Sequence, residues 1–238
     1  NISIAAVAFA SAHTPLTYDY SAYALDANLG FPPFLVGRWF VSCPVLFACC
    51  APAYNALPLY LSLARAVQLR FPVPGSLDLR LAYAVLGTAG FALYQVCPVA
   101  GPLYRFGAMF PFHPPFVVPL GPAPLFAAAR NGMPSLHFGW VLLVFCYCRS
   151  YRRTWIALLS GLFLILTALA TLGSGEHYLV DLLVAIPLVC AVYGACSQTR
   201  TPLRWGAVVG ATMLTLFCLV TVRTAGSGRT PDLVVHRR

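Results

Sequence analysis

Residues 154 to 172 read TWIALLSGLFLILTALATL and contain no charged side chain. A helix needs about 20 predominantly apolar residues to cross the hydrocarbon core of a bilayer, and this run has that length. The neighbouring runs, 135 to 149 and 178 to 197, are also apolar. Across the chain, 60% of the residues are hydrophobic and 9% are charged, which excludes an ordinary soluble domain. We therefore predict an integral membrane protein.

Further apolar runs, bounded by arginine, proline or glycine, extend this pattern along the chain. We expect about six membrane-spanning helices, at 39 to 64, 81 to 98, 135 to 149, 154 to 172, 178 to 197 and 205 to 222. The apolar start, Ile2 to Ala12, could be the end of a further helix. The predicted fold class is all-α, a polytopic transmembrane helix bundle forming one domain over residues 1 to 238.

The arginines predict the orientation of this bundle. Three connections between the expected helices contain several of them, namely 65 to 80, 149 to 153 and 198 to 204. Short arginine-rich loops stay on the cytoplasmic side, and the expected threading puts all three on one side. The C-terminal tail, with Arg229, Arg237 and Arg238, falls on the opposite side and violates the rule. Either the last helix does not fully cross or the tail is tolerated.

The remaining composition excludes several partners. The net charge is +9, and every basic residue is arginine. Without a basic stripe interleaved with aromatic residues, we expect contact with anionic lipid headgroups and no nucleic acid binding. The nine cysteines lie mostly in apolar runs and form no CxxC pair, so we interpret them as packing residues. We expect no metal and no cofactor.

Asp181 is the only acidic residue inside an expected span, and His177 precedes it by four residues. Ionisable groups at membrane depth are costly and are therefore functional candidates. A carboxylate one helical turn from an imidazole can accept a hydrogen bond from one ring nitrogen and raise the basicity of the other. A histidine nucleophile or base needs this arrangement. The alternative is a buried polar pair that satisfies only itself.

The segment GMPSLH, Gly132 to His137, stands at the start of the expected helix 135 to 149. Ser135 can cap this helix or, with the free backbone amides beside it, hold an anion. The expected threading brings His137 and His177 to the same membrane face. Two histidines and a carboxylate near an anion-binding helix end favour a phosphoryl-transfer site, although each histidine alone could be an ordinary interfacial residue.

These residues carry a resemblance to a known family. PSLH (Pro134 to His137) and HYLVD (His177 to Asp181) resemble the second and third motifs of the type 2 phosphatidic acid phosphatase (PAP2) superfamily, P-S-G-H and S-R-x5-H-x3-D. The forms that these two motifs take in this chain are more similar to the branch that contains inositol phosphorylceramide synthases. The run Tyr94 to Tyr104 also resembles that branch. The resemblance covers about residues 80 to 200, which would form the catalytic core.

Two departures from the family pattern concern its phosphate ligands. The first phosphatase motif, K-x6-R-P, cannot exist in a chain without lysine, and the arginine of the third motif aligns with Thr171. Arg105 and Arg130 are candidate replacements, since a guanidinium binds phosphate oxygens bidentately. The alternative is that they are ordinary interfacial arginines. Further candidate substrate-binding residues are Ser135, Tyr104 and Tyr178.

The resemblance implies a mechanism. His177 would attack phosphorus, Asp181 would orient its imidazole, and His137 would protonate the leaving oxygen, with a phosphohistidine intermediate. The substrate would be a phospholipid or another lipid phosphate, and a lipid alcohol could be the acceptor. We favour phosphotransfer over hydrolysis of phosphatidate or prenyl phosphates, with the site on the non-cytoplasmic face. A third alternative is a transporter or scaffold with a structural His/Asp pair.

Overall fold

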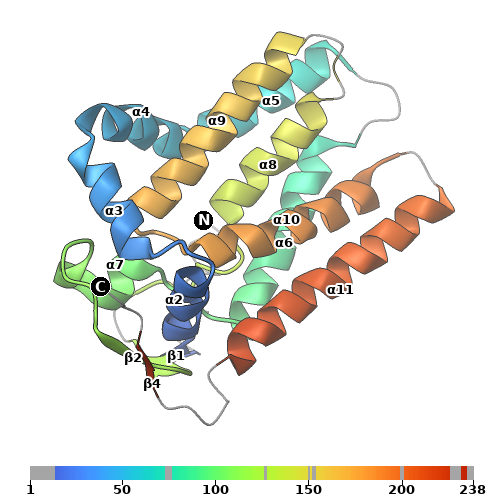
Figure 1. Ribbon diagram of the computed structural model, residues 1–238. Helices are drawn as coiled ribbons and strands as arrows, with labels where there is room; N and C mark the ends of the chain where they lie inside the picture. The colour runs from blue at the N-terminus through green and yellow to red at the C-terminus, as the bar shows by residue number, and fades with distance from the viewer. Residues whose placement is uncertain are drawn as a thin grey trace.

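The computed structural model describes residues 14–72, 77–125, 128–149, 151, 154–198 and 201–225, together with the backbone of 232–234. Its long elements are all helices (Figure 1), so the prediction of an all-α fold is confirmed. The helices are α2 (Asp19–Asn28), α3 (Pro33–Ser42), α4 (Pro44–Asn55), α5 (Leu57–Arg70), α6 (Leu79–Val96), α7 (Pro102–Phe106), the short 3-10 helix η1 (Gly107–Met109), α8 (Leu136–Cys148), α9 (Thr154–Gly173), α10 (Leu179–Cys196) and α11 (Pro202–Thr224).

Three of the described helices, α9, α10 and α11, are long and apolar enough to cross a membrane. The pair α3 and α4 would be a fourth span if its two helices are counted together, although they are bent by 106°. Helix α8 has 13 residues, about 20 Å of helix against a hydrocarbon core of about 30 Å. The expectation of six full spans is therefore not confirmed, while the membrane setting is supported.

The first expected span, 39 to 64, is wrong as a single helix. The chain breaks there into α3, α4 and α5, with Cys43 and Ala56 between them. Pro44 occupies the first position of α4, and Pro58 lies in the first turn of α5. Proline lacks the backbone N–H that a continuing helix needs and clashes with the preceding turn, so each of these prolines starts a new helix.

Helix α10 is the centre of the bundle. It contacts α11, α8, α6 and α2, and more than half of its apolar stretch is buried. Helix α11 lies at the periphery, with only 17% of its stretch buried. The functional motif at the start of α10 is therefore surrounded by packed elements on several sides.

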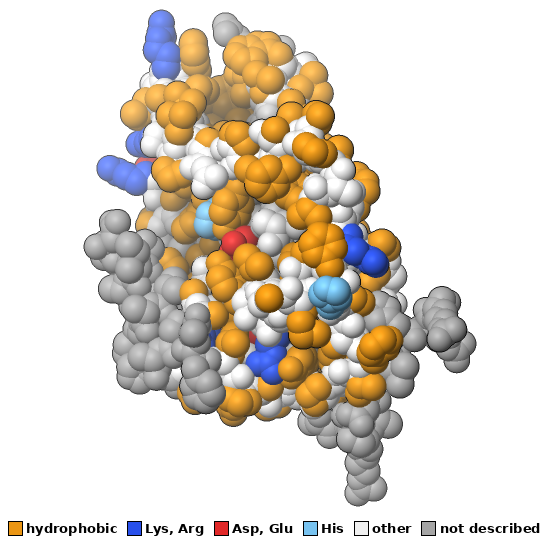
Figure 2. All heavy atoms as spheres, turned by 90° about the vertical axis from the view of Figure 1, so that its left-hand side faces the viewer, with side chains coloured by type: hydrophobic (Ala, Val, Ile, Leu, Met, Phe, Trp, Pro, Cys, Tyr) orange, Lys and Arg blue, Asp and Glu red, His pale blue; other side chains and the backbone are white. Residues whose placement is uncertain are grey.

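Apolar side chains cover much of the outer surface, as Figure 2 shows for the face formed by the left-hand side of Figure 1. On α9, Leu158, Leu162 and Ile165 are each more than half exposed. They recur every three or four residues, so they occupy one face of the helix. A surface of this kind is stable against lipid and unstable in water, which agrees with an integral membrane protein.

The two ends of the bundle differ. The C-terminal ends of α5, α8 and α10 lie at one end with the starts of α6, α9 and α11, and α2, α7 and the short strands lie at the other (Figure 1). Strand β1 (Leu16–Thr17) pairs with β3 (Ala123–Pro124), and β2 (Val117–Pro119) pairs with β4 (Asp232–Val234), both antiparallel. The expected segment Ile2 to Ala12 and the tail arginines Arg229, Arg237 and Arg238 lie outside the described residues.

Residues 14 to 38, which precede the first expected span, are largely helical. They contain α2, whose carboxylates Asp19 and Asp26 are almost completely buried. Tyr23 of α2 also packs edge-on against Phe34 of α3 and Phe106 of α7, with ring centroids 5.9 and 5.1 Å away. This aromatic cluster holds α2 against the end of the bundle where the predicted histidines lie.

Candidate active site

His177 and Asp181 form the centre of the candidate site. His177 Nδ1 lies 3.3 Å from Asp181 Oδ2, and the two side chains are 5% and 0% exposed. His177 precedes α10 and Asp181 lies in its first turn, so the pair spans the start of the helix. Because the carboxylate engages Nδ1, Nε2 is the ring nitrogen left for chemistry.

Burial sets the protonation state of His177. Removal of the ring from water lowers its pKa to about 4, although the nearby Glu176 acts in the opposite direction. The imidazole is therefore neutral near pH 7, with a lone pair on the nitrogen that carries no proton. A neutral ring is the form that can act as a nucleophile or as a base.

The second predicted motif is in direct contact with the first. The backbone N–H of Ser135 donates to the Asp181 carbonyl at 3.1 Å, and the backbone of Gly132 acts on the His177 ring in the direction that raises its pKa. His137, in the first turn of α8, is near enough to His177 for their charges to repel. Both segments thus meet at one end of the bundle.

Tyr54 holds His137 and was not anticipated from the sequence. The two rings are stacked, with centroids 4.4 Å apart and planes inclined by 6°. Tyr54 comes from α4 and also lies within electrostatic range of Glu176 and Tyr104. The bend between α3 and α4, which replaces the expected single span, is therefore part of what brings α4 to the site. No motif in the sequence marks this tyrosine.

Carboxylates occupy the N-terminus of α10. Asp26 of α2 accepts the backbone N–H groups of Leu179 and Val180 at 2.6 and 2.9 Å, and Asp181 accepts that of Tyr178 at 2.9 Å. Burial raises the pKa of Asp26 to about 8; Asp181 raises it further, while the two amides lower it. These amides are already satisfied and are not free to bind a phosphate.

Asp19 fixes a second backbone segment near the site. Its carboxylate accepts the N–H groups of Ala100 and Gly101, at 3.1 and 2.9 Å from Oδ1. Burial raises the pKa of Asp19. The segment held in this way also touches the loop that precedes His177, because Leu103 N donates to Gly175 O at 2.9 Å. Asp19 and Asp26 are seven residues apart on one helix, and this spacing is the only sequence signal that could have identified them.

The predicted phosphate ligands Arg105 and Arg130 bind backbone carbonyls. Arg105 donates to Pro124 O at 2.9 Å, and its guanidinium lies 3.9 Å from the centre of the Tyr20 ring. Arg130 is 1% exposed and donates to Thr14 O at 3.1 Å and to Ala128 O. Within the described residues, neither hydrogen-bonds to His137, His177 or Asp181. Arg105 Nε is buried without a partner and so keeps one free donor.

The other predicted binding residues occupy two kinds of position. Tyr104 is 40% exposed, and its hydroxyl donates to Glu176 Oε2 at 2.8 Å, beside His177. Burial and the Glu176 carboxylate raise the pKa of Tyr104 to about 12, so it is a hydrogen-bond donor at neutral pH. Ser135 caps α8, accepting Phe138 N at 3.5 Å. Tyr178 is completely buried in the core, where its side chain interacts with Asp19.

Comparisons with known proteins bear on this site at the level of the family. The model of the PAP2 superfamily matches residues 21–195, well over half of the chain. The matched range includes His137, His177 and Asp181, and it begins within α2, upstream of the segment that carries the sequence resemblance. No curated protein and no solved structure matches the chain.

Proposed function

The chain belongs to the PAP2 superfamily, and from this premise we propose that it transfers a phosphoryl group or phospho-headgroup between lipid substrates, with His177 as nucleophile. Members of the superfamily are generally phosphatases or phosphotransferases that act on lipid phosphates in a membrane setting. The observation that carries the proposal is the buried His177–Asp181 pair, 3.3 Å apart, with His137 across from it.

In the first step, Nε2 of His177 attacks phosphorus and forms an N–P bond while the P–O bond to the leaving group breaks. The negative charge of the bound phosphate ester favours the protonated form of His137, which takes up a proton as the substrate binds. His137 then donates this proton to the departing oxygen, so the product leaves as an alcohol. Asp181 accepts the Nδ1–H hydrogen bond and balances the positive charge that develops on the imidazole. The intermediate is a phosphohistidine.

In the second step, a lipid hydroxyl takes the group from His177. His137, now neutral, accepts the proton of this hydroxyl, the new O–P bond forms and the N–P bond breaks. His177 returns to its starting state, so protons and electron pairs balance over the cycle. If water replaces the lipid hydroxyl, the same steps give hydrolysis.

The charges around His177 favour a phosphodiester over a phosphomonoester. Glu176 places a carboxylate beside the nucleophile, and carboxylates already satisfy the first amides of α10. Arg130 is engaged by backbone carbonyls, which leaves the buried Nε of Arg105 as a free donor. A monoester dianion needs more compensating charge than a phosphodiester, which carries one negative charge. Transfer between phosphodiester lipids fits this balance.

The orientation and the subfamily are parts of the same proposal. The similarity of residues 94 to 104 and 132 to 137 to inositol phosphorylceramide synthases supports a transferase. The site lies at the end of the bundle opposite the arginine-bearing connections (Figure 1), which supports a non-cytoplasmic active site.

Incubation of the purified protein with a phosphorus-labelled phosphodiester lipid, with and without a lipid alcohol, tests the proposal. A transferase forms a new labelled phospholipid only when the alcohol is present. Release of a labelled water-soluble phosphate without the alcohol would indicate a phosphatase. Absence of both products under conditions that keep the protein folded would contradict an enzyme and favour a transporter or scaffold.

A further inference from the structure

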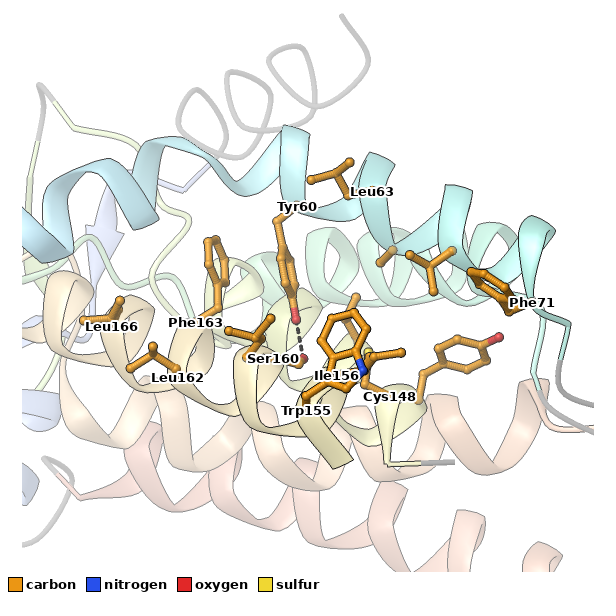
Figure 3. A pocket seen from close by; sticks show the side chains of 15 residues that line it. Tyr60, Leu63, Phe71, Cys148, Trp155, Ile156, Ser160, Leu162, Phe163 and Leu166 are labelled. Carbon is orange, nitrogen blue, oxygen red and sulfur yellow. Dashed lines mark hydrogen bonds between the residues drawn. The ribbon is translucent and has the colours of Figure 1, made fainter. Parts of the chain in front are cut away.

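An apolar groove lies between α5, α8 and α9 (Figure 3), and His137, His177 and Asp181 are not among its lining residues. Its volume is about 520 Å³, within the range of pockets that bind small molecules. The residues that line it include Leu63 of α5, Phe71 directly after α5, and Trp155, Leu159 and Leu166 of α9. We call it the α5–α9 groove.

The polar groups inside the α5–α9 groove satisfy each other. The hydroxyls of Tyr60 and Ser160 form a hydrogen bond across it, drawn as a dashed line in Figure 3. The Tyr60 ring is also stacked on Phe163, with centroids 4.0 Å apart. The groove therefore presents mainly hydrocarbon and aromatic surface to an occupant.

The length of the groove matches one bilayer leaflet. Along α9 it extends from Trp155 to Leu166, about 16 Å at the helical rise of 1.5 Å per residue. This is about half of the ~30 Å hydrocarbon thickness. The groove therefore reaches from the arginine-bearing end of the bundle to about the middle of the membrane, which is the depth of one acyl chain.

Two exposed arginines, Arg70 and Arg149, are each adjacent in sequence to a residue that lines one end of the groove. The Arg70 guanidinium lies 5.1 Å from the centre of the Phe71 ring, and Arg149 directly follows the lining residue Cys148. The Tyr151 hydroxyl donates to Phe71 O at 3.0 Å, so the ends of α5 and α8 lie together. Positive charge therefore collects where the groove opens.

These two arginines differ from others at the same end. Arg65 and Arg80 both pair with Asp78, at 3.2 and 4.0 Å. Arg70 and Arg149 are exposed and form no salt bridge within the described residues. Their charge is thus available to an anion from outside the chain.

We propose that the α5–α9 groove binds one acyl chain of an anionic phospholipid, with the lipid phosphate against Arg70 and Arg149. The apolar wall takes the chain, and the uncompensated guanidiniums select a headgroup with net negative charge over a zwitterionic one. This site lies in the leaflet opposite the histidines and is separate from the proposed reaction.

Quenching of Trp155 fluorescence by brominated lipids tests the site, because this side chain lines the groove. The protein is reconstituted in phosphatidylcholine vesicles with a minor fraction of chain-brominated phosphatidylglycerol or chain-brominated phosphatidylcholine. Subtraction of the signal of Trp155→Phe isolates the Trp155 contribution. We expect the apparent affinity for phosphatidylglycerol to exceed that for phosphatidylcholine by a factor on the order of ten, because two guanidiniums near the membrane surface attract the anionic headgroup.

Matched variants separate the site from general charge effects. Arg70→Ala with Arg149→Ala should abolish the preference, and Arg70→Lys with Arg149→Lys, which keep the charge, should retain most of it. Arg80→Ala removes an exposed arginine at the same end and should leave the preference unchanged.

Three outcomes would overturn the proposal. Equal quenching by both brominated lipids would mean ordinary bilayer contact. A preference that persists in the double alanine variant would remove Arg70 and Arg149 from the site. A long-chain phosphodiester substrate could also displace the brominated lipid from the groove. If it did so equally well in the natural chain and in the double alanine variant, the groove would be assigned to the substrate chain.

Discussion

Asp26 accepts the backbone N–H of Leu179 at 2.6 Å, across 153 positions of sequence. The same carboxylate also accepts Val180 N, so α2 caps the helix that carries Asp181 and immediately follows His177. This cap fixes where α10 begins and therefore how the pair is oriented. Asp26 is a positioning residue in this account, and it touches neither histidine through any described hydrogen bond.

Replacement of Asp26 tests this role. Asp26→Leu leaves two buried amides unsatisfied, at a cost of about 1–3 kcal/mol for each group, and should lower kcat at least tenfold with a smaller change in KM. Asp26→Asn keeps one acceptor oxygen, so its kcat should lie between that of the natural chain and that of Asp26→Leu. Activity and thermal unfolding are measured in the same detergent.

Asp78 provides the control for Asp26. It caps α6 at the other end of the bundle through Arg80 N at 2.9 Å. Asp78→Ala should reduce stability by about 1 kcal/mol and leave kcat unchanged. If Asp26→Leu lowered stability but not kcat, Asp26 would be structural only.

The stacking of Tyr54 on His137 predicts a specific kinetic signature. Tyr54→Phe keeps the stacked ring and should retain activity, while Tyr54→Ala frees His137 and should lower the rate by about 10²-fold or less, the scale of general acid catalysis. The loss should be large with an alcohol leaving group and small with a nitrophenol, which leaves without a proton. An equal loss with both leaving groups would contradict a role through His137.

The lowered pKa of His177 predicts the acid limb of the pH–rate profile. The nucleophile must be neutral, so activity should fall as the pH drops through about 4, and not near the ordinary value of 6.5. The free energy of unfolding should also fall as the pH drops. Between pH 6.5 and pH 4 the unfolded His177 ring binds a proton, while the folded ring does not. The stability contributed by the neutral ring is complete above 6.5 and is lost between 6.5 and 4. An acid limb near 6.5 in kcat/KM would contradict a buried neutral ring.

Alanine substitutions at two glycines distinguish the effect of backbone strain from that of steric crowding. Gly101 has φ +117°, and a Cβ there would lie 2.3 Å from the Glu176 carbonyl oxygen, next to His177. Gly101→Ala should destabilise the protein by several kcal/mol and reduce activity sharply. Gly107 has φ +53° with nothing near a Cβ, so Gly107→Ala should cost only about 1–2 kcal/mol and keep activity. Equal effects of the two substitutions in unfolding and activity assays would contradict this contact.

The sequence could predict the local part of the site. His177 and Asp181 are four residues apart, and Ser135 precedes an apolar run, so short-range rules suffice for the pair and for the start of α8. The threading of apolar runs also placed His137 and His177 at one end of the bundle. These features depend on local spacing and on the hydrophobic pattern, which a single sequence contains.

The rest depends on contacts between distant segments. Asp19 and Asp26 lie in a short helix without a strong apolar face, and their partners are more than 80 positions away. Arg105 and Arg130 could face phosphate or backbone carbonyls, and only the fold around them decides which. Pro44 and Pro58 mark the breaks within 39 to 64, while the apolar composition of that run favours a single span.

Covalent trapping on His177 tests the central claim most directly. The protein is incubated with the phosphorus-labelled phosphodiester lipid without acceptor, quenched in alkali, which spares an N–P bond, and digested for peptide mapping. The account predicts label on the peptide that contains His177, its loss on brief acid treatment, and no label in His177→Ala. Label on another residue, or full turnover by His177→Ala, would contradict it.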